Sequence, residues 1–288
     1  MRIGISGGSG DLSRRIISQL IENGFPASQL VVGSRTPERL KSLSHQGVDV
    51  RRLDFSDAAS VRETFGECER VLLMSIEDPL FDIKGREYHA NAIKACAESG
   101  VQHLLYTSCI GAFLFGDGSP YEVHADAEWH LQASGCRYTV LRYDLFAEMI
   151  EFDLRNAVRL DGGTWLSTAG DGGCAWICKD DIARSTAAIL RLGEPSTLYT
   201  LTGDRSLSLT EVVRAVNEKF GTEIKHKSVT PDEFDRYYEE RNRDNVEKNH
   251  LRLLFSKIRE GHCSTVTNDV ERLTGMKPAP FLDAIDMT

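Results

Sequence analysis

Short apolar runs alternate with segments of helical periodicity through the first half of the chain. The apolar runs predict six strands, at residues 2–6, 29–34, 48–55, 70–75, 103–108 and 137–142. The segments between them have the spacing of amphipathic helices and cover residues 12–21, 37–46, 57–65, 81–99 and 121–133. Several strands are continuous apolar runs, which is typical of a parallel sheet covered on both faces. The alternation therefore predicts right-handed βαβ crossovers and an α/β fold with a doubly wound parallel sheet.

The pattern loosens after about residue 150. The elements predicted there are strands at 164–168, 174–178 and 199–203, a helix from Asp180 to Leu192, a helix from about Thr210, and mostly helical structure over the charged segment 231–260. No linker rich in Pro, Gly or Ser separates the two halves. We therefore expect a doubly wound domain over 1–150 and a small, mostly helical lobe over 151–288, which includes elements that return to the sheet.

A glycine-rich turn follows the first predicted strand. The sequence GGSGDLS has the spacing G-x-x-G-x-x-S from Gly7 through Gly10 to Ser13. Residues without a Cβ let the backbone turn tightly and approach a pyrophosphate, which then meets the N–H groups at the start of the next helix. An ordinary surface turn is the alternative, but the strand–turn–helix context favours a dinucleotide. The predicted phosphate contacts are Gly7, Gly8, Ser9, Gly10, Asp11 and Leu12.

The end of the second predicted strand indicates which dinucleotide binds. An NAD site usually places an acidic residue there to accept bonds from the ribose hydroxyls, whereas this chain has Ser34 and Arg35 and no acid before Glu38. Arg35 is suited to a 2′-phosphate, so the sequence favours NADPH over NADH; a solvated arginine at a strand end is the alternative. Asp54 is placed to accept a bond from the adenine amino group, or else to cap a helix. The remaining residues assigned to the cofactor are Phe55, Met74, Ser75 and Ile76.

Composition and charge restrict the partners. The chain has 288 residues, 41% of them hydrophobic and 27% charged, with a formal net charge of −9. A surface of this sign repels nucleic-acid phosphates and anionic lipid, so we expect a small-molecule substrate and neither nucleic acid nor a membrane as partner. No apolar patch in the sequence specifies an interface, so the sequence does not decide between a monomer and a homo-oligomer.

Targeting and metal signals are also missing from the sequence. The polar residues 6–13 interrupt any signal-peptide pattern, and no run reaches the roughly 18 apolar residues of a membrane span. The 7 cysteines include no C-x-x-C pair, and Cys174 and Cys178 have no further ligand nearby in the sequence. We therefore expect a cytoplasmic protein with reduced thiols and no metal.

Several longer segments resemble one known family. The segments GGSGDLS, VVGSRTPERL, GVDVRRLDFSD, SGCRYTVLR and AWICKDDIARSTAAIL, together with the closing SKIREG, are similar to the NmrA-like group of atypical short-chain dehydrogenases. Within that group the chain resembles NADPH:quinone oxidoreductases and triphenylmethane reductase. The resemblance covers nearly the whole chain. It implies an NADP-binding Rossmann domain, a substrate-binding C-terminal lobe, and a substrate in the cleft between them.

Two departures from the usual pattern of short-chain dehydrogenases affect the expected chemistry. Ser13 takes the place of the third glycine of the turn. No Tyr-x-x-x-Lys pair occurs, because Tyr106, Tyr121 and Tyr143 are followed four residues later by Ile, Ala and Ala. The usual acid, a tyrosine whose pKa is lowered by a neighbouring lysine, is therefore missing. Relatives in the NmrA-like group lack the pair as well, so its absence fits the resemblance.

Candidates for the chemistry come from two segments. The resemblance places the end of the fifth strand beside the nicotinamide, which here means Ser108, Cys109 and Ile110. Ser108 could donate to a developing oxyanion, or could satisfy its own loop. His124 could supply a proton at neutral pH, or could form a structural pair with Glu128, since residues four apart share a helix face.

The segment after the sixth strand should border the substrate pocket. It contains Tyr143, a third catalytic candidate, and the pocket candidates Asp144 and Phe146. Aromatic rings there could stack on a flat substrate such as a quinone, although Phe146 could equally belong to the core.

Two functions follow from these residues. The first is an NADPH-dependent oxidoreductase that reduces a quinone-like, enone or imine small molecule by direct hydride transfer. The alternative is a non-catalytic, NADP-binding redox sensor of the NmrA type. The substrate-pocket candidates favour the enzyme.

Overall fold

The computed structural model describes residues 1–76, 84–113, 121–160, 162–193, 198–241 and 244–287. The chain forms two compact units. The first unit consists of Met1–Arg142 and Ile182–Thr200, and the second of Tyr143–Asp181 and Leu201–Thr288. The division thus falls at Arg142 instead of residue 150, and most of helix α7 (Lys179–Leu192) returns to the first unit.

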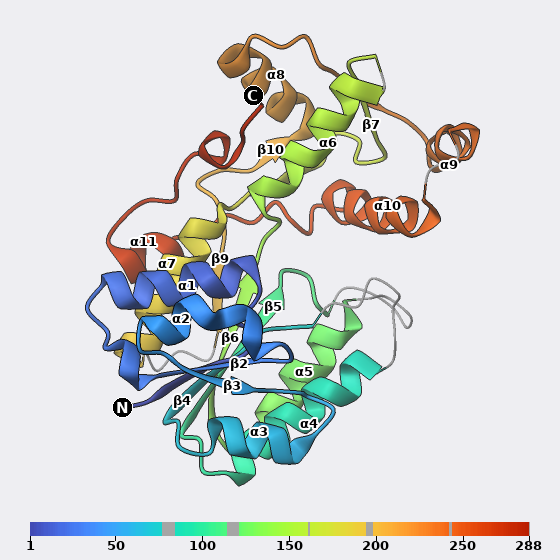
Figure 1. The fold of residues 1–288 in the computed structure, drawn as a ribbon. Coiled ribbons are helices and arrows are strands. Elements are labelled where there is room, and N and C mark those ends of the chain that lie inside the picture. Colours follow the sequence, from blue (N-terminus) through green and yellow to red (C-terminus); the bar gives the residue numbers. More distant parts are fainter. Residues whose placement is uncertain (77–83, 114–120, 161, 194–197, 242–243, 288) are drawn as a thin grey trace. The chain divides into compact units, whose positions relative to one another are not determined.

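A seven-stranded sheet organises the first unit (Figure 1). Its strands are β1 (Ile3–Ile5), β2 (Leu30–Ser34), β3 (Asp49–Arg52), β4 (Arg70–Leu73), β5 (His103–Cys109), β6 (Arg137–Tyr143) and β9 (Leu198–Leu201). Their order is β3-β2-β1-β4-β5-β6-β9, and the pairings of β1 with β2 and β4, of β2 with β3 and of β4 with β5 are parallel. The chain runs outward from β1 to β3 and then crosses to β4 on the other side of β1. This reversal confirms the predicted doubly wound sheet.

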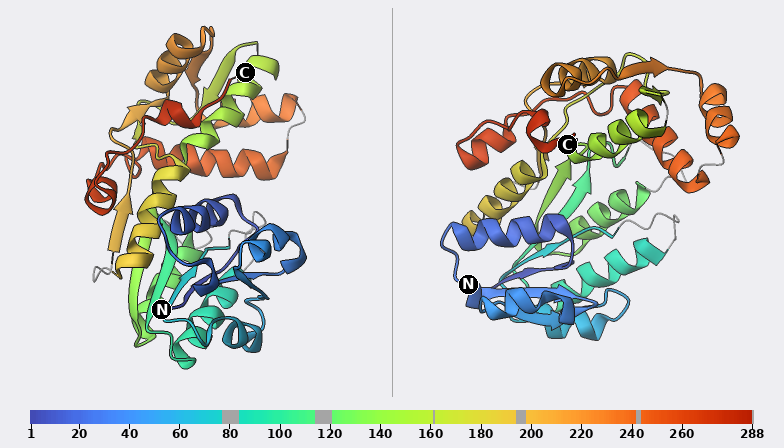
Figure 2. Two further views of the ribbon diagram at one scale, coloured as in Figure 1. Left: turned by 60° about the vertical axis from the view of Figure 1, so that its left-hand side comes forward. Right: turned by 45° about the horizontal axis from the view of Figure 1, so that its top comes forward.

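Helices cover both faces of this sheet. They are α1 (Asp11–Glu22), α2 (Lys41–His45), α3 (Ala58–Phe65), α4 (Lys84–Glu98), α5 (Glu122–Ala133) and α7, with short 3₁₀ turns at Ala27–Gln29 and Pro37–Leu40. Helices α3, α4 and α5 lie together on one face, and α1 and α7 lie on the other (Figure 1 and Figure 2). The apolar stripe of each helix explains this arrangement: Phe65 of α3 and Leu131 of α5, for example, are fully buried in one cluster with Tyr106 of β5.

The second unit combines helices with two small sheets. Its elements are α6 (Ala147–Leu160), β7 (Thr164–Ser167), β8 (Gly173–Cys174), β10 (Leu207–Ser208), α8 (Leu209–Phe220), β11 (Lys225–Ser228), α9 (Pro231–Glu240), α10 (Asn245–Arg259), α11 (Asp269–Thr274) and a 3₁₀ turn at Phe281–Ala284. Strand β7 pairs with β11 in parallel, and β8 pairs with β10 in antiparallel. Capping boxes at Ser208 and Thr230 fix the starts of α8 and α9.

Two element predictions need correction. The segment 174–178 is a strand only at Cys174, because Ala175 and Ile177 donate their backbone N–H groups to the loop carbonyls of Cys263 and Leu145. The helix predicted at 37–46 begins as the 3₁₀ turn at Pro37–Leu40. The predicted residues 81–83 lie outside the described part of the chain. Among the helices that the structure describes, none has both the length and the apolar composition that a membrane crossing requires.

The turn after β1 lies unusually close to β2. A Cβ built on Gly8 would stand 2.2 Å from Cγ1 of Val32, and the Gly8 N–H donates to the carbonyl of Gly33 at 3.0 Å. Gly7 before it has a φ of 65°, a conformation that residues with side chains seldom adopt. These two glycines let the chain leave β1 and enter α1 within a few residues.

Gly8→Ala is expected to lower the free energy of unfolding by about 1–3 kcal/mol, because the new methyl group must displace Val32 in a packed interior. Urea denaturation followed by circular dichroism measures the change. Ser9→Ala is the matched control, since Ser9 is exposed. A Gly8→Ala protein as stable as the control would show that the approach of the turn to β2 is looser than described.

Candidate cofactor and substrate site

The carboxyl ends of β1 and β4 meet where the strand order reverses, and the glycine turn lies at this edge. Helix α1 starts at Asp11 with Gly10 as N-cap, and no side chain caps it. Helix geometry leaves the first N–H groups without an intrahelical acceptor, here those of Leu12 and Ser13, and gives this end a partial positive charge. Ser9, Gly10 and Asp11 are exposed. The turn thus has the features that hold an anionic group.

Ser13 replaces the third glycine without disturbing the turn. It is buried, and its hydroxyl lies 3.4 Å from the carbonyl oxygen of Ser6 at the end of β1. A Cβ on Gly7 would lie 3.6 Å from the Ser13 hydroxyl, an ordinary contact. The serine therefore fits between the helix and the strand.

Polar side chains gather at the ends of β2 and β3. The hydroxyl of the buried Ser34 accepts from the Thr36 N–H at 3.1 Å, and Arg35 is exposed. Asp54 accepts from both the N–H and the hydroxyl of Ser56, and these bonds hold the pKa of its carboxyl below its usual value. The alternative role as a helix cap is wrong for Asp54, because the N-cap of α3 is Asp57, which accepts from the Ala59 N–H at 2.9 Å.

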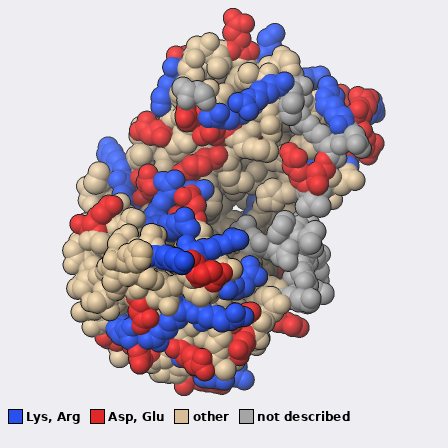
Figure 3. Space-filling model, in the orientation of Figure 1, with Lys and Arg blue, Asp and Glu red and all other residues tan. Residues whose placement is uncertain are grey.

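Arg52 is a second cation at this edge, one that sequence reasoning missed. It pairs in register with Ser34 across β2 and β3 and is exposed. Both Arg35 and Arg52 are close enough to Asp54 to favour its charged form. The signal was the Arg51-Arg52 pair at the end of the third strand, which is too short to suggest a nucleic-acid patch. On the face that Figure 3 shows, Lys and Arg side chains lie among acidic ones over the first unit.

Three side chains fix the segment that follows β4. The N–H of Met74 donates to the hydroxyl of Ser6 at 2.7 Å, and that of Ser75 donates to the hydroxyl of Thr107 at 2.7 Å. The N–H of Ile76 donates to Nε2 of His89 at 2.9 Å, so this imidazole nitrogen carries no proton. Thr107 and His89 carried no signal in the sequence, because only the fold brings them to this edge.

Buried rings connect this edge to helix α5. Phe55 meets His89 edge to face, His89 meets Tyr106, and Tyr106 meets His124, with centroid distances of 6.3, 5.4 and 6.0 Å. The Tyr106 hydroxyl lies 3.2 Å from Nδ1 of His124, which is 1% exposed. Phe55 and His124 thus contribute to the packing behind the strand ends.

Ser108 belongs to a buried charged network. Its hydroxyl donates to Oε1 of Glu128 at 2.6 Å, and Arg142 donates to both oxygens of the same carboxylate at 3.0 and 2.6 Å. The hydrogen bond to Glu128 raises the pKa of Arg142. The expectation that Ser108 satisfies its own loop is therefore wrong, and the hydrogen bonds of Glu128 go to Ser108 and Arg142 instead of His124. The neighbouring Cys109 is partly buried, and Ile110 is 9% exposed.

The remaining candidates lie in the second unit. Tyr143 is buried, with its ring 6.5 Å from that of the half-buried Phe146. Asp144 accepts from the Leu145 N–H at 2.8 Å, and the thiol of Cys174 donates to it at 3.6 Å. Ligand atoms of Asp144, Cys174 and Cys263 lie within 4.8 Å of one another. Cys174 and Cys178, which lie four residues apart in the sequence, have different partners. The thiol of Cys178 lies 3.6 Å from the carbonyl oxygen of Pro280 instead of near Asp144.

Burial raises the pKa of Asp144 to about 7 from its usual 3.8. Between pH 3.8 and about pH 7, Asp144 is therefore protonated in the folded chain and ionised in the unfolded chain. The contribution of Asp144 to stability is greatest below pH 3.8 and is lost as the pH rises through about 7. Asp144→Asn, which keeps an acceptor for Leu145, is expected to be more stable than wild type at pH 8, by up to about 4 kcal/mol.

Urea denaturation at pH 5 and pH 8 measures this difference, with the exposed Asp232→Asn as control. The gain for Asp144→Asn over wild type should grow between the two pH values. A gain that stays constant across them would contradict a protonated Asp144.

The chain is similar to known NAD(P)H-binding proteins. A family described as NAD(P)H-binding matches residues 7–191. Quinone oxidoreductase 2 of Escherichia coli (strain K12) is 29% identical over 236 residues, which cover 81% of this chain and 79% of that protein. The NmrA-like family domain-containing oxidoreductase flvB of Aspergillus flavus is 25% identical over 292 residues, 99% of this chain and 94% of that protein.

Solved structures show the same fold. NADPH-dependent quinone oxidoreductase QOR2 of Escherichia coli, complexed with NADPH, has a TM-score of 0.89 at 25% identity, with 98% of each chain covered. Triphenylmethane reductase of Citrobacter sp., complexed with NADP(H), has a TM-score of 0.86 at 23% identity, with 99% of each chain covered. These relatives confirm the resemblance to NmrA-like and quinone-reductase proteins. The match to the family described as NAD(P)H-binding covers more than half of this chain, so the chain belongs to that family.

Proposed function

We propose that this oxidoreductase of the NAD(P)H-binding family transfers hydride directly from NADPH to a quinone-like, enone or imine small molecule. The observation that carries the proposal is the uncapped start of α1, which follows the glycine turn at the reversal of strand order. Relatives that are 25–29% identical and named as oxidoreductases support the reaction class.

The residues at the strand ends fit a dinucleotide. Gly7 turns the chain in a conformation that needs glycine, and Gly10 leaves the start of α1 without a side chain, so this turn would hold the pyrophosphate. The exposed Arg35 and Arg52 would hold a 2′-phosphate, with Asp54 beside them for the adenine. NADPH, when bound, supplies the hydride.

The chain itself contributes mainly orientation. The side chains of Ser6, Thr107 and His89 fix the segment Met74–Ile76 through its backbone, which would position the nicotinamide half of the cofactor. Ser108 directs its proton to Glu128, so we assign it to positioning at the end of β5 rather than to proton donation. Hydride transfer depends chiefly on such alignment, which accords with the absence of a Tyr-x-x-x-Lys pair from the sequence.

Substrate recognition would use the aromatic residues of the second unit. The rings of Tyr143 and Phe146 lie together, and Phe146 is only half-buried. An aromatic surface of this kind favours a flat, conjugated molecule. Proton donation by Tyr143 or His124 is a further element of the proposal, and an NADP-binding sensor without turnover is its alternative.

Arg35→Ala is expected to weaken NADPH binding about tenfold to a hundredfold and NADH binding very little, because only NADPH carries the phosphate that the guanidinium would contact. Fluorescence titration with both nucleotides measures the two dissociation constants. Arg62→Ala, which removes an exposed arginine from α3, is the control. Equal losses for the two nucleotides would remove the assigned role of Arg35.

NADPH consumption with a panel of quinones, triarylmethane dyes, enones and imines tests the activity. Turnover with at least one class is expected, and a folded Gly10→Val protein should lose both turnover and NADPH binding. A Cβ there would lie 3.2 Å from the backbone carbonyl of Gly7, a tight contact, so circular dichroism and urea denaturation must first show that the variant is folded and as stable as wild type. Tight NADPH binding without turnover would favour the sensor, and unchanged binding by Gly10→Val would contradict the site.

A further inference from the structure

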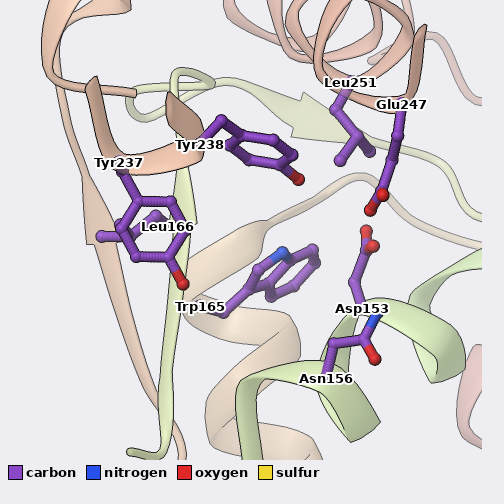
Figure 4. Close-up of a pocket in the computed structure, with 8 residues that line it drawn as sticks. All are labelled: Asp153, Asn156, Trp165, Leu166, Tyr237, Tyr238, Glu247 and Leu251. Carbon is purple, nitrogen blue, oxygen red and sulfur yellow. The ribbon is translucent and has the colours of Figure 1, made fainter. Parts of the chain in front are cut away.

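A group of three metal-ligating side chains lies buried in the second unit. The ligand atoms of Asp144, Cys174 and Cys263 lie within 4.8 Å of one another. By contrast, the pocket that Asp153 and Glu247 line (Figure 4) has room for roughly one water molecule, at about 20 Å³, and suits no larger ligand. A metal ion needs no such cavity, because it takes the place of the protons on the atoms that surround it.

The three ligands come from segments far apart in the sequence, which is why the cysteine spacing predicted no metal. Asp144 directly follows β6, Cys174 ends β8, and Cys263 lies shortly after α10. Backbone hydrogen bonds hold these segments: the Ala175 N–H donates to the carbonyl of Cys263 at 2.8 Å, and the Asp144 N–H donates to that of Leu201 at 3.1 Å. The fold therefore sets the positions of the ligands.

The cluster is closed off from solvent. Cys174 and Cys263 are 0% exposed, and Asp144 is 2% exposed. Oδ1 of Asp144 accepts from the Leu145 N–H and from the Cys174 thiol, whereas its Oδ2 has no hydrogen-bond partner among the described residues. A buried carboxyl oxygen of this kind costs free energy unless a proton or a cation satisfies it.

The spacing of the donor atoms fits zinc. In tetrahedral sites Zn²⁺ binds thiolate sulfur at about 2.3 Å and carboxylate oxygen at about 2.1 Å, which separates these two atoms by roughly 3.6 Å. The Sγ of Cys174 lies 3.6 Å from Oδ1 of Asp144. The other carboxylate oxygen, Oδ2, offers a fourth donor besides the Cys263 sulfur. Thiolates favour zinc over Mg²⁺ and Ca²⁺, which prefer oxygen ligands.

The charge around the cluster also suits a divalent ion. Two thiolates and one carboxylate carry three negative charges, so Zn²⁺ leaves one, and the buried Lys257 is close enough to favour the charged form of Asp144. The N–H of Ala175 acts in the same direction. Burial raises the pKa of the Cys174 thiol in the absence of a metal. Since a buried, protonated thiol reacts poorly with oxidants, these cysteines suit a metal better than a disulfide.

We propose that Asp144, Cys174 and Cys263 form a structural zinc site that joins the end of β6 to β8 and to the segment after α10. The ion enters as the chain folds, and its binding free energy adds to the stability of the second unit. Binding displaces the protons of the thiols and the carboxyl group, so the pH dependence described above for Asp144 is that of the metal-free chain. The site is separate from the proposed hydride transfer.

Refolding with metal tests the site. The full chain is reduced with a phosphine, unfolded in urea with EDTA, freed of EDTA and refolded with one equivalent of Zn²⁺ or Co²⁺. We expect about one zinc per chain to remain after gel filtration, and the Co²⁺ protein to show the near-ultraviolet charge-transfer band of a cobalt–thiolate bond. Zn²⁺ should also raise the urea midpoint above that measured in EDTA, because it stabilises the folded chain.

Variants of the ligands test their roles. Asp144→Asn, Cys174→Ser and Cys263→Ser should each weaken Zn²⁺ binding about a hundredfold or more, because each removes a charged ligand. Competition with a chromophoric chelator measures the affinities, and circular dichroism shows which variants fold. Cys178→Ser is the matched control, since its thiol is also buried but lies against Pro280, and it should bind Zn²⁺ as wild type does.

The wild-type metal content and Co²⁺ spectrum test the site even where a variant does not fold. The proposal fails if refolded wild type retains no zinc, if its Co²⁺ form lacks the thiolate band, or if the folded ligand variants bind Zn²⁺ like wild type. An equal loss of zinc in Cys178→Ser would also contradict it. A Cys174–Cys263 disulfide in the freshly isolated chain, found by mass spectrometry, would identify a redox pair instead and would overturn it.

Discussion

The contact between the glycine turn after β1 and strand β2 constrains the edge of the sheet at which helix α1 begins. Gly8 lies so close to Val32 that a methyl group has no room, and Gly7 adopts a backbone conformation that suits glycine. Together they direct α1 away from β1 within a few residues, at the position where the strand order reverses. The start of α1 therefore lies near the carboxyl ends of β1 and β4, at the reversal of strand order, which is where doubly wound folds bind nucleotides.

The other strand ends are ordered by side chains that reach across from neighbouring elements. Ser6, Thr107 and His89 each accept one N–H of the segment after β4, and the Ser108–Glu128–Arg142 network joins β5, α5 and β6. Burying a carboxylate is costly unless it is paired and hydrogen-bonded, and here Arg142 and Ser108 satisfy Glu128. A fixed edge of this kind suits a reaction that depends on alignment more than on a proton donor.

The sequence predicted the features that depend on local patterns. Continuous apolar runs identified the parallel strands, and glycine spacing after the first strand identified the turn. Roles that depend on a distant partner were predicted less well. Asp57, not Asp54, caps α3, and Glu128 pairs with Arg142, because a helix face shows which residues lie side by side but not what packs against them. The strand predicted at 174–178 is longer than the observed one, because the N–H groups of Ala175 and Ile177 bond to loops that are remote in the sequence or lie outside the sheet.

The central claim, direct hydride transfer, is tested most directly with NADPH carrying deuterium at C4 of the nicotinamide. Each of the two C4 stereoisomers is reacted with an enone or a triarylmethane dye, acceptors in which the hydride ends on a carbon that does not exchange with water. Mass spectrometry of the product should show one deuterium from one stereoisomer and none from the other. Oxidation of NADPH without deuterium in the product from either stereoisomer would contradict the account.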